Sequence, residues 1–225
     1  MRRKNLLGSL VVGLARCRTI GSTFCSATAS AAPTTSENGW NIIPLSETSC
    51  FDQGRNATFC LANDDVAAVF ADLVDWFDDN IEPVGEPFEV DEGKPIWALA
   101  ANSDDGSWFA PQYIPPAGVQ LSNHGSATSV DINFGTHPID KGLDTVTPEQ
   151  QQKIRDKIAE YDGLIAWGGD YQGHVDPMHF ELQVGKTNDD VRAVMDKLGI
   201  KSETFDSPPD VEMPNLESLG LTPVS

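Results

Sequence analysis

Two short segments of this chain alternate apolar with polar residues, and this alternation restricts the fold more than any other feature. From residue 129 to residue 134, Asp131 stands between apolar neighbours. From residue 178 to residue 183, His179 and Glu181 stand between apolar residues in the same way. A period of two is typical of a half-buried strand, because successive side chains point to opposite faces. The pattern therefore predicts two strands that each bury one face and present Asp131 and His179 on the other.

His124 is a third residue of a metal-ligand type, and it precedes Gly125 in a predicted loop. If the two strands are neighbours, His124, Asp131 and His179 meet in one cleft. A catalytic zinc ion is held by three such ligands, imidazole nitrogens or carboxylate oxygens, and keeps a fourth position open. Calcium and magnesium prefer shells made only of oxygen. We therefore predict that these three residues bind one Zn2+ ion.

Asp176 lies three residues before His179 and directly before Pro177. The residue before a proline is biased toward an extended conformation, so we expect Asp176 at the mouth of the second strand. A carboxylate beside a metal ion can accept the proton of the attacking water. We predict that Asp176 is the catalytic base.

Two further acidic residues are candidates for holding a ligand imidazole by its free N–H, as carboxylates around metal sites often do. Asp170 follows a Gly-Gly pair and is either such a residue or a turn residue, with the turn favoured. Glu181 shares the face of His179 and either supports it or is simply solvated. His137 and His174 fall outside the pattern, and we expect them on the surface or in a supporting role rather than as ligands.

At these residues the chain resembles the zinc peptidases that cut bacterial cell-wall peptides, namely the VanY-like D-Ala-D-Ala carboxypeptidases and the phage L-Ala-D-Glu endolysins. Their S-x-H-x(6)-D pattern is matched by Ser122, His124 and Asp131, and their D-x-x-H element is matched by Asp176 and His179. The resemblance implies the same ligands and base as above. It also implies that Ser122 helps to position the substrate.

The resemblance covers about residues 95–185 and implies a fold and a substrate. The fold is α+β, a small antiparallel sheet with helices packed on one side and the zinc site on the sheet, as in the hedgehog-like relatives of this fold. The substrate is a peptidoglycan stem peptide, cut next to a D-residue. Two alternatives stay open, a wall-binding module that keeps zinc without turnover and a secreted scaffold protein without metal. The intact Asp176 argues against the first of these.

The bond that is cut depends on how the substrate is held. Carboxypeptidases of the family commonly place an arginine upstream of the S-x-H motif, where a guanidinium can grip a terminal carboxylate with two hydrogen bonds. This chain has neither lysine nor arginine between Lys94 and Lys141. An endopeptidase needs no such cation. We therefore expect cleavage within the stem peptide, with D-Ala-D-Ala trimming as the alternative.

The amino terminus has the layout of a secretory signal peptide. Residues 2–4 are basic, residues 6–15 are mostly apolar, and small residues follow as far as residue 32. A disordered basic arm is the alternative. An apolar run of about ten residues is too short to span a bilayer, so we expect no stable membrane insertion. The predicted location is extracellular, at the cell wall.

The charge of the remaining chain is strongly negative. The first 32 residues hold five of the 15 basic residues and no acidic ones, which leaves 10 basic against 34 acidic residues. Nucleic acid is excluded as a partner, because phosphate binding requires a basic surface. Peptidoglycan is the only partner that we expect, and the protein is predicted to be a monomer.

Cysteine usage agrees with export. Cys17 and Cys25 lie in the predicted signal peptide, which leaves Cys50 and Cys60 as an even pair. Outside the cytosol such a pair favours a disulfide over two free thiols. Neither cysteine fits the zinc motif.

Caps and apolar spacing predict the other elements. Asn63 and Thr147 precede apolar residues at helical spacing and are predicted N-caps, and Gln150 completes a capping box with Thr147. The predicted elements are helices at 63–79, 147–161 and 189–198, strands at 96–100, 129–134, 164–167 and 178–183, and an irregular segment at 108–120 that lines or covers the site.

A chain of 225 residues with 40% hydrophobic content can bury one core, so one folded domain is expected. We predict a signal peptide at 1–32, a polar lead-in segment with the Cys50–Cys60 loop at 33–62, and the zinc peptidase domain at 63–201. Residues 202–225 lack periodicity and are predicted to be a disordered acidic tail rich in proline and serine.

Overall fold

The structure is a computed structural model of the chain, and it describes residues 34–54, 56–86, 105–108 and 121–208. All of these residues belong to one compact unit. The predicted signal peptide, the predicted strand at 96–100 and most of the segment at 108–120 lie outside the described residues. Within the described ranges, no helix has both the length and the apolar character needed to cross a membrane.

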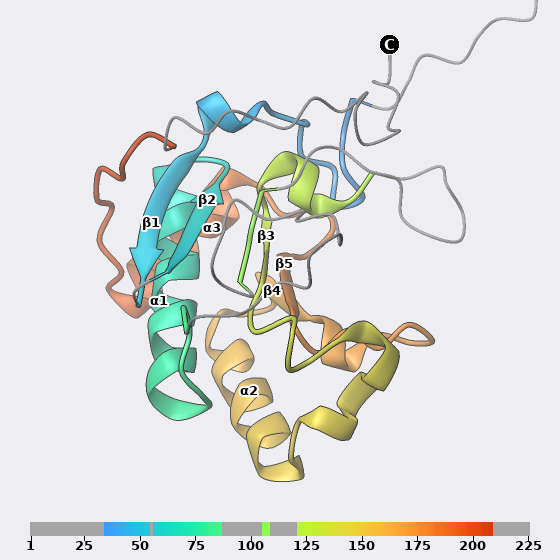
Figure 1. Ribbon diagram of the computed structural model, residues 1–225. Helices are drawn as coiled ribbons and strands as arrows, with labels where there is room; N and C mark the ends of the chain where they lie inside the picture. Colours follow the sequence, from blue (N-terminus) through green and yellow to red (C-terminus); the bar gives the residue numbers. More distant parts are fainter. Residues whose placement is uncertain (1–33, 55, 87–104, 109–120, 209–225) are drawn as a thin grey trace, which may run out of the picture. The chain divides into compact units, whose positions relative to one another are not determined.

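The described residues form an α+β fold, as predicted, with helices and strands mixed along the chain (Figure 1). The strands and α-helices are β1 (Ser49–Gln53), β2 (Ala57–Leu61), α1 (Asp64–Asn80), β3 (Ser129–Asp131), α2 (Pro148–Glu160), β4 (Ile165–Trp167), β5 (His179–Leu182) and α3 (Asn188–Leu198). Short 3-10 helices are η1 (Leu45–Glu47), η2 (Asn123–Ser126), η3 (Ile139–Thr145) and η4 (Gly168–Asp170).

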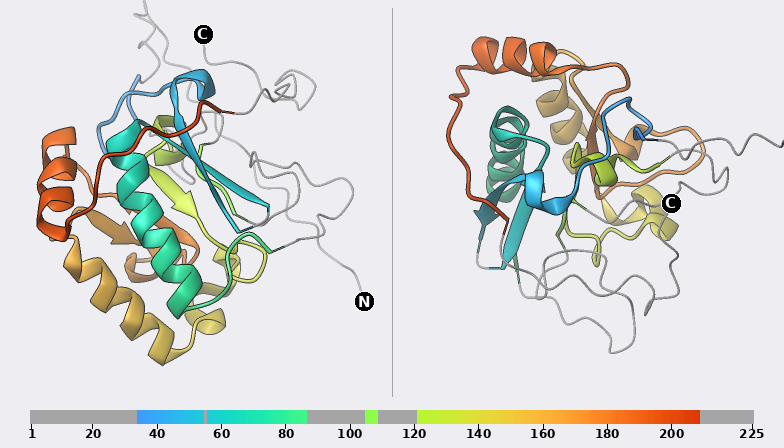
Figure 2. Two further views of the ribbon diagram at one scale, coloured as in Figure 1. Left: turned by 90° about the vertical axis from the view of Figure 1, so that its left-hand side faces the viewer. Right: turned by 90° about the horizontal axis from the view of Figure 1, so that it is seen from above.

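Within the described ranges the strands form two small antiparallel sheets. One is the β1–β2 hairpin, and in the other β5 lies between β3 and β4 and pairs with both. One face of the larger sheet packs into the core. The residues on this face include Val130, Phe180 and Leu182, which are fully buried. Phe77 of α1 packs edge-on against Phe180 with 5.9 Å between ring centroids. Figure 2 shows α1 lying across this sheet. The opposite face is left for the polar residues of the alternating pattern.

The strand predicted at 129–134 ends early. Ile132 continues the pairing, since its N–H donates to the carbonyl of Met178 at 2.9 Å. Asn133 then adopts a φ of 54°, in the left-handed region that strands do not use. The chain therefore turns away from the sheet directly after the residues that carry the site.

Each α-helix begins at a capping side chain. Asn63 accepts from the N–H of Val66 at 3.1 Å, as predicted, and Thr147 forms the predicted capping box with Gln150. The third helix starts one residue earlier than expected, behind a second capping box at Thr187. A cap of this kind stabilises a helix by about 1 kcal/mol. These local devices explain why the predicted helix bounds are close to the observed ones.

Segments on both sides of the predicted boundaries at residues 62 and 201 are built into one compact unit. Asn38, from the lead-in segment, is buried, and its N–H donates to the side chain of Asn123 at 3.0 Å. At the other end, Asp206 exchanges two backbone hydrogen bonds with Cys50, at 2.8 and 3.1 Å. A disordered tail is therefore not what residues 202–208 form, and the rest of the predicted tail lies outside the described residues.

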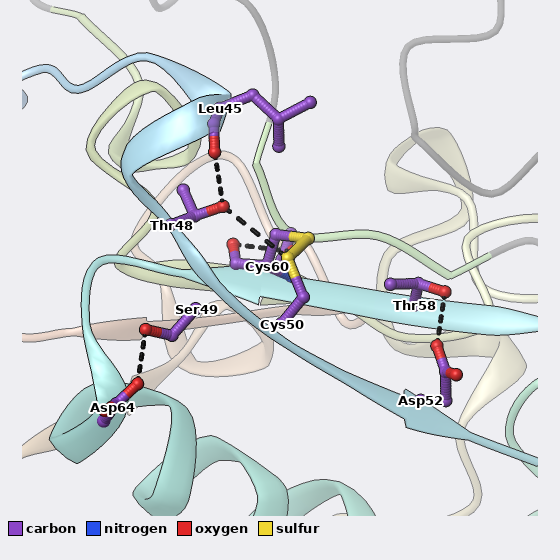
Figure 3. The surroundings of a disulfide bond; sticks show 9 residues. Leu45, Thr48, Ser49, Cys50, Asp52, Thr58, Cys60 and Asp64 are labelled. Carbon is purple, nitrogen blue, oxygen red and sulfur yellow. Dashed lines mark hydrogen bonds between the residues drawn. A yellow bond between two sulfur atoms is a disulfide. The ribbon is translucent and has the colours of Figure 1, made fainter. Parts of the chain in front are cut away.

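Cys50 and Cys60 form the predicted disulfide, which joins the two strands of the hairpin (Figure 3). The two residues are direct partners in the antiparallel register of β1 and β2. Their side chains are buried together with Leu45, Trp108 and Ala127 in a small apolar cluster. The disulfide thus links β1 to β2 at the place where the hairpin packs next to η2.

Candidate metal centre and general base

The three predicted ligands converge on one point. Asp131 ends β3 and His179 begins β5, and the two are direct partners in the register of these strands. His124 comes from η2. The Nδ1 of His179 lies 2.8 Å from the Oδ1 of Asp131 and 3.2 Å from the Nε2 of His124. The remaining pair, His124 Nε2 and Asp131 Oδ1, is 3.3 Å apart. All three residues are buried, and their ligand atoms lie within 4.8 Å of one another.

This donor set fits a metal ion of the zinc type. Two imidazole nitrogens and one carboxylate oxygen are the ligands of many catalytic zinc sites. Burial raises the pKa of Asp131, but the neighbouring His124 and His179 outweigh it and hold that pKa well below its usual range. Burial lowers the pKa of His179, but hydrogen bonds with Asp131 and Glu181 raise it to about 10. The cluster therefore favours positive charge at its centre, and a cation can take the place of that proton.

Each imidazole is held from the nitrogen that faces away from the cluster. The Nδ1 of His124 is hydrogen-bonded to the backbone carbonyl of Ser107. The Nε2 of His179 is bonded to the carboxylate of Glu181 at 3.2 Å. Such a partner fixes the tautomer and the orientation of a ligand ring. The Nε2 of His124 and the Nδ1 of His179 are therefore left to face Asp131.

Glu181 is itself held in place, so it is not a freely solvated carboxylate. Asn123 donates a hydrogen bond to it from Nδ2. Tyr171 is hydrogen-bonded to it as well, and the Tyr171 ring lies 6.3 Å from that of His179. Burial, followed by the charge of Glu181, raises the pKa of Tyr171, so its hydroxyl stays a donor. Sequence reasoning missed Asn123 and Tyr171, although Asn123 lies inside the S-x-H motif.

Asp176 has the properties of a general base next to this cluster. Its Oδ1 is a buried oxygen that has no hydrogen-bond partner among the described residues. Burial, and then the charge of Asp131, raise its pKa to about 6, while His179 and His124 act in the opposite direction. A base is most effective when its pKa lies near the working pH. The carboxylate is thus available to accept a proton.

The Trp-Gly-Gly turn explains how Asp176 is positioned. The carbonyl of Gly168 accepts from the N–H of Asp176 at 2.9 Å, and the indole N–H of Trp167 donates to the carbonyl of Pro177 at 2.8 Å. A Cβ on Gly168 would stand 2.3 Å from the carbonyl oxygen of Asp176. A Cβ on Gly169 would stand 2.4 Å from the ring of Trp167. A side chain at Gly168 would therefore displace the backbone of Asp176, and one at Gly169 would displace the Trp167 ring.

The other residues singled out in the sequence lie outside the metal cluster. Ser122 is half-buried at the start of η2, and its hydroxyl accepts from the N–H of His124 at 3.3 Å. Asp170 is exposed and forms an ion pair with Arg155 at 2.8 Å, so the turn alternative holds and it does not support a ligand. His174 is exposed, in line with the sequence.

His137 does not lie on the surface. It is buried in a separate network, bonded through Nε2 to Glu82 and through Nδ1 to Thr145 at 2.9 Å. Asn133 donates to the same Glu82 carboxylate at 2.8 Å. This network joins the end of α1 to the segment that follows β3, and the sequence contained no periodic pattern from which it could be predicted.

Comparison with known proteins agrees with this geometry. Residues 117–182 match the sequence model of a family described as D-alanyl-D-alanine carboxypeptidase. The matched segment contains all three residues of the cluster and Asp176. The chain has no match among curated proteins or among solved structures. Over residues 117–182, then, the motif-based resemblance to the VanY-like peptidases is confirmed by the family match.

Proposed function

We propose that the protein is a zinc-dependent peptidase that hydrolyses peptidoglycan stem peptides next to D-amino acids. The observation that carries this proposal is the buried cluster of His124, Asp131 and His179 beside Asp176, whose buried Oδ1 has no hydrogen-bond partner among the described residues. The family match supports a peptidase that acts on peptidoglycan. We propose zinc as the metal and a bond next to a D-residue as the bond that is cut.

The residues divide the chemistry between them. A zinc ion held by the cluster would polarise the scissile carbonyl and make the attacking water more acidic. Asp176 accepts the proton of that water and returns it to the leaving amine. Ser107 and Glu181 keep the two imidazoles in the orientation that the cluster needs. Ser122 adjoins His124 and helps to position the substrate.

We propose cleavage within the stem peptide as the first choice. The support is the absence of lysine and arginine between Lys94 and Lys141, because trimming of a terminal D-alanine calls for a cation that binds its carboxylate. D-Ala-D-Ala trimming is the second candidate, and the description of the matched family favours it.

We also propose that the protein acts outside the cytoplasm as a monomer. The signal-like amino terminus supports export, and so does the Cys50–Cys60 disulfide, since structural disulfides persist in oxidising compartments. The excess of acidic residues supports the absence of a nucleic-acid partner.

One experiment tests the activity. Purified full-length protein is analysed for zinc and incubated with peptidoglycan, and the released muropeptides are identified by mass spectrometry, with Asp176→Asn as the inactive control. Internal cleavage by the wild type but not by Asp176→Asn supports the proposal. Free D-alanine without internal cleavage would select the second candidate.

Two other outcomes would reject an active enzyme. Bound zinc and cosedimentation with peptidoglycan, without any product, would identify a binding module. If the protein holds no zinc and releases no product, the scaffold alternative is the one that remains.

A further inference from the structure

We propose that Ser107 is a positioning residue that couples the Cys50–Cys60 hairpin to the metal ligand His124, so that the hairpin and its disulfide support metal affinity. The inference rests on the proposed function in one respect, that His124 is a ligand. Ser107, Cys50 and Cys60 lie outside the metal motifs and would support the site from there.

Ser107 touches the cluster from a short segment, residues 105–108, that runs beside β3. All four residues of the segment are buried. Gly106 exchanges two backbone hydrogen bonds with Asp131, at 2.9 and 2.7 Å. The carbonyl of Ser107 is bonded to the Nδ1 of His124. Two neighbouring residues therefore contact two of the three predicted ligands.

The side chain of Ser107 ties the same segment to the hairpin. Its hydroxyl accepts from the N–H of Cys60 at 2.5 Å and donates to the carbonyl of Cys60 at 3.0 Å. One hydroxyl can do both, because it is a donor and an acceptor at once. Ser107 thus joins the backbone of Cys60 to the ring of His124 through a single residue.

The disulfide lies at the position where the hairpin offers those backbone groups. In an antiparallel pair, every second set of opposed residues turns its N–H and C=O away from the partner strand. Cys50 and Cys60 are such a set, since Cys50 pairs with Asp206 and Cys60 pairs with Ser107. The covalent bond therefore fixes the hairpin at the residue that holds Ser107.

Packing gives a second connection between the hairpin and η2. The disulfide is buried against Trp108, which follows Ser107, and against Ala127, which ends η2. The N–H of Ala62, directly after β2, donates to the carbonyl of Ala127 at 2.8 Å. Loss of the disulfide would loosen both the segment that holds the His124 ring and the turn that carries it.

The variants isolate this coupling. Ser107→Ala removes the hydroxyl bridge, and Cys50→Ser combined with Cys60→Ser removes the disulfide. The matched control is Thr58→Ala, on the same strand as Cys60. Among the residues that the structure describes, the Thr58 hydroxyl bonds only to Asp52, at 2.7 Å on the exposed side (Figure 3). Urea unfolding of each metal-free variant verifies that it is folded under the binding conditions.

Zinc affinity is measured by competition with a chromogenic chelator. Loss of a direct partner of a metal ligand typically weakens metal binding about 10- to 100-fold. Ser107→Ala and the double cysteine variant keep the Ser107 carbonyl and remove only its support, so we expect a measurable loss of zinc affinity below that range in both. Thr58→Ala should bind zinc like the wild type. If the wild type and the three variants bind zinc with equal affinity, the coupling is rejected and the metal site is not.

A second measurement does not depend on metal. The exchange rate of the His124 Nδ1 proton, followed by NMR in the metal-free protein, should rise in Ser107→Ala and in the double cysteine variant but not in Thr58→Ala. Faster exchange in a protein that binds no zinc would keep the coupling and reject the proposed function. Unchanged exchange, with or without zinc binding, would reject the coupling.

Discussion

Asp131 and His179 stand directly opposite each other on β3 and β5, with 2.8 Å between Oδ1 and Nδ1. Both side chains therefore come from paired strands whose other faces are packed into the core, and only His124 comes from a turn. Functional groups on regular elements are held more precisely than groups on loops. This pairing explains why two short sequence motifs, far apart in the chain, form one site.

The three predicted ligands should be equally necessary. Purified protein is expected to carry one zinc ion per chain, and His124→Ala, Asp131→Ala and His179→Ala should each lose metal and activity together. Inductively coupled plasma mass spectrometry, combined with the muropeptide assay, measures both. His174→Ala is the control, because His174 is exposed and outside the cluster, and it should keep its zinc. A ligand variant with full zinc content would contradict the assignment.

Asp176→Asn should separate base from ligand. The variant is nearly isosteric and leaves the cluster intact, so zinc content should stay near normal. Turnover should fall about 10²- to 10⁴-fold, the usual contribution of a positioned general base. Activity on peptidoglycan and metal content are compared in the same preparation. Loss of zinc would show that Asp176 is a ligand instead.

Glu181 and Asp170 test which carboxylate supports a ligand ring. Glu181→Ala removes the partner of His179 Nε2 and should weaken zinc binding about 10- to 100-fold. Within the described part of the chain, Asp170→Ala breaks only the surface ion pair with Arg155, and it should leave zinc affinity unchanged. Chelator competition measures both variants. The opposite order of effects would be incompatible with the geometry described above.

Gly168→Ala should damage the base more than the metal site. The new Cβ would stand 2.3 Å from the carbonyl oxygen of Asp176, so the backbone of Asp176 has to move. Overpacking of this kind typically costs about 1–3 kcal/mol of stability. We expect a lower urea midpoint and reduced turnover with most of the zinc retained. Wild-type turnover in this variant would show that the turn does not position Asp176.

The Glu82–His137 network should make stability depend on pH. Burial raises the pKa of Glu82, but hydrogen bonds with His137 and Asn133 outweigh this effect. The pKa of Glu82 in the folded protein is therefore below its ordinary value of 4.5. Because the folded pKa is depressed, the ionised group stabilises the fold above pH 4.5, and this contribution is lost as the pH falls through the folded pKa. Urea unfolding of Glu82→Gln and the wild type should differ most at pH 7 and converge in acid. A constant difference would exclude this linkage.

Local features could be predicted from the sequence because their physical causes are local. The alternation around Asp131 and His179 defines which side chains share a face, whatever the rest of the fold does. The caps at Asn63 and Thr147 bind N–H groups only three residues away, so their consequences are also visible in the sequence. The candidate metal ligands and the candidate base can be predicted on that ground.

The partners of those residues were decided by the tertiary structure. Ser107 has no periodic or motif signal, yet its carbonyl holds His124 and its hydroxyl holds Cys60. Glu181 and Asp170 are both acidic residues near the second motif, and only the fold turns Glu181 toward His179 and Asp170 toward Arg155. A strand pattern gives the direction of a side chain, but a hydrogen bond also requires that its partner lie within about 3 Å. That proximity arises only when segments distant in the chain pack together.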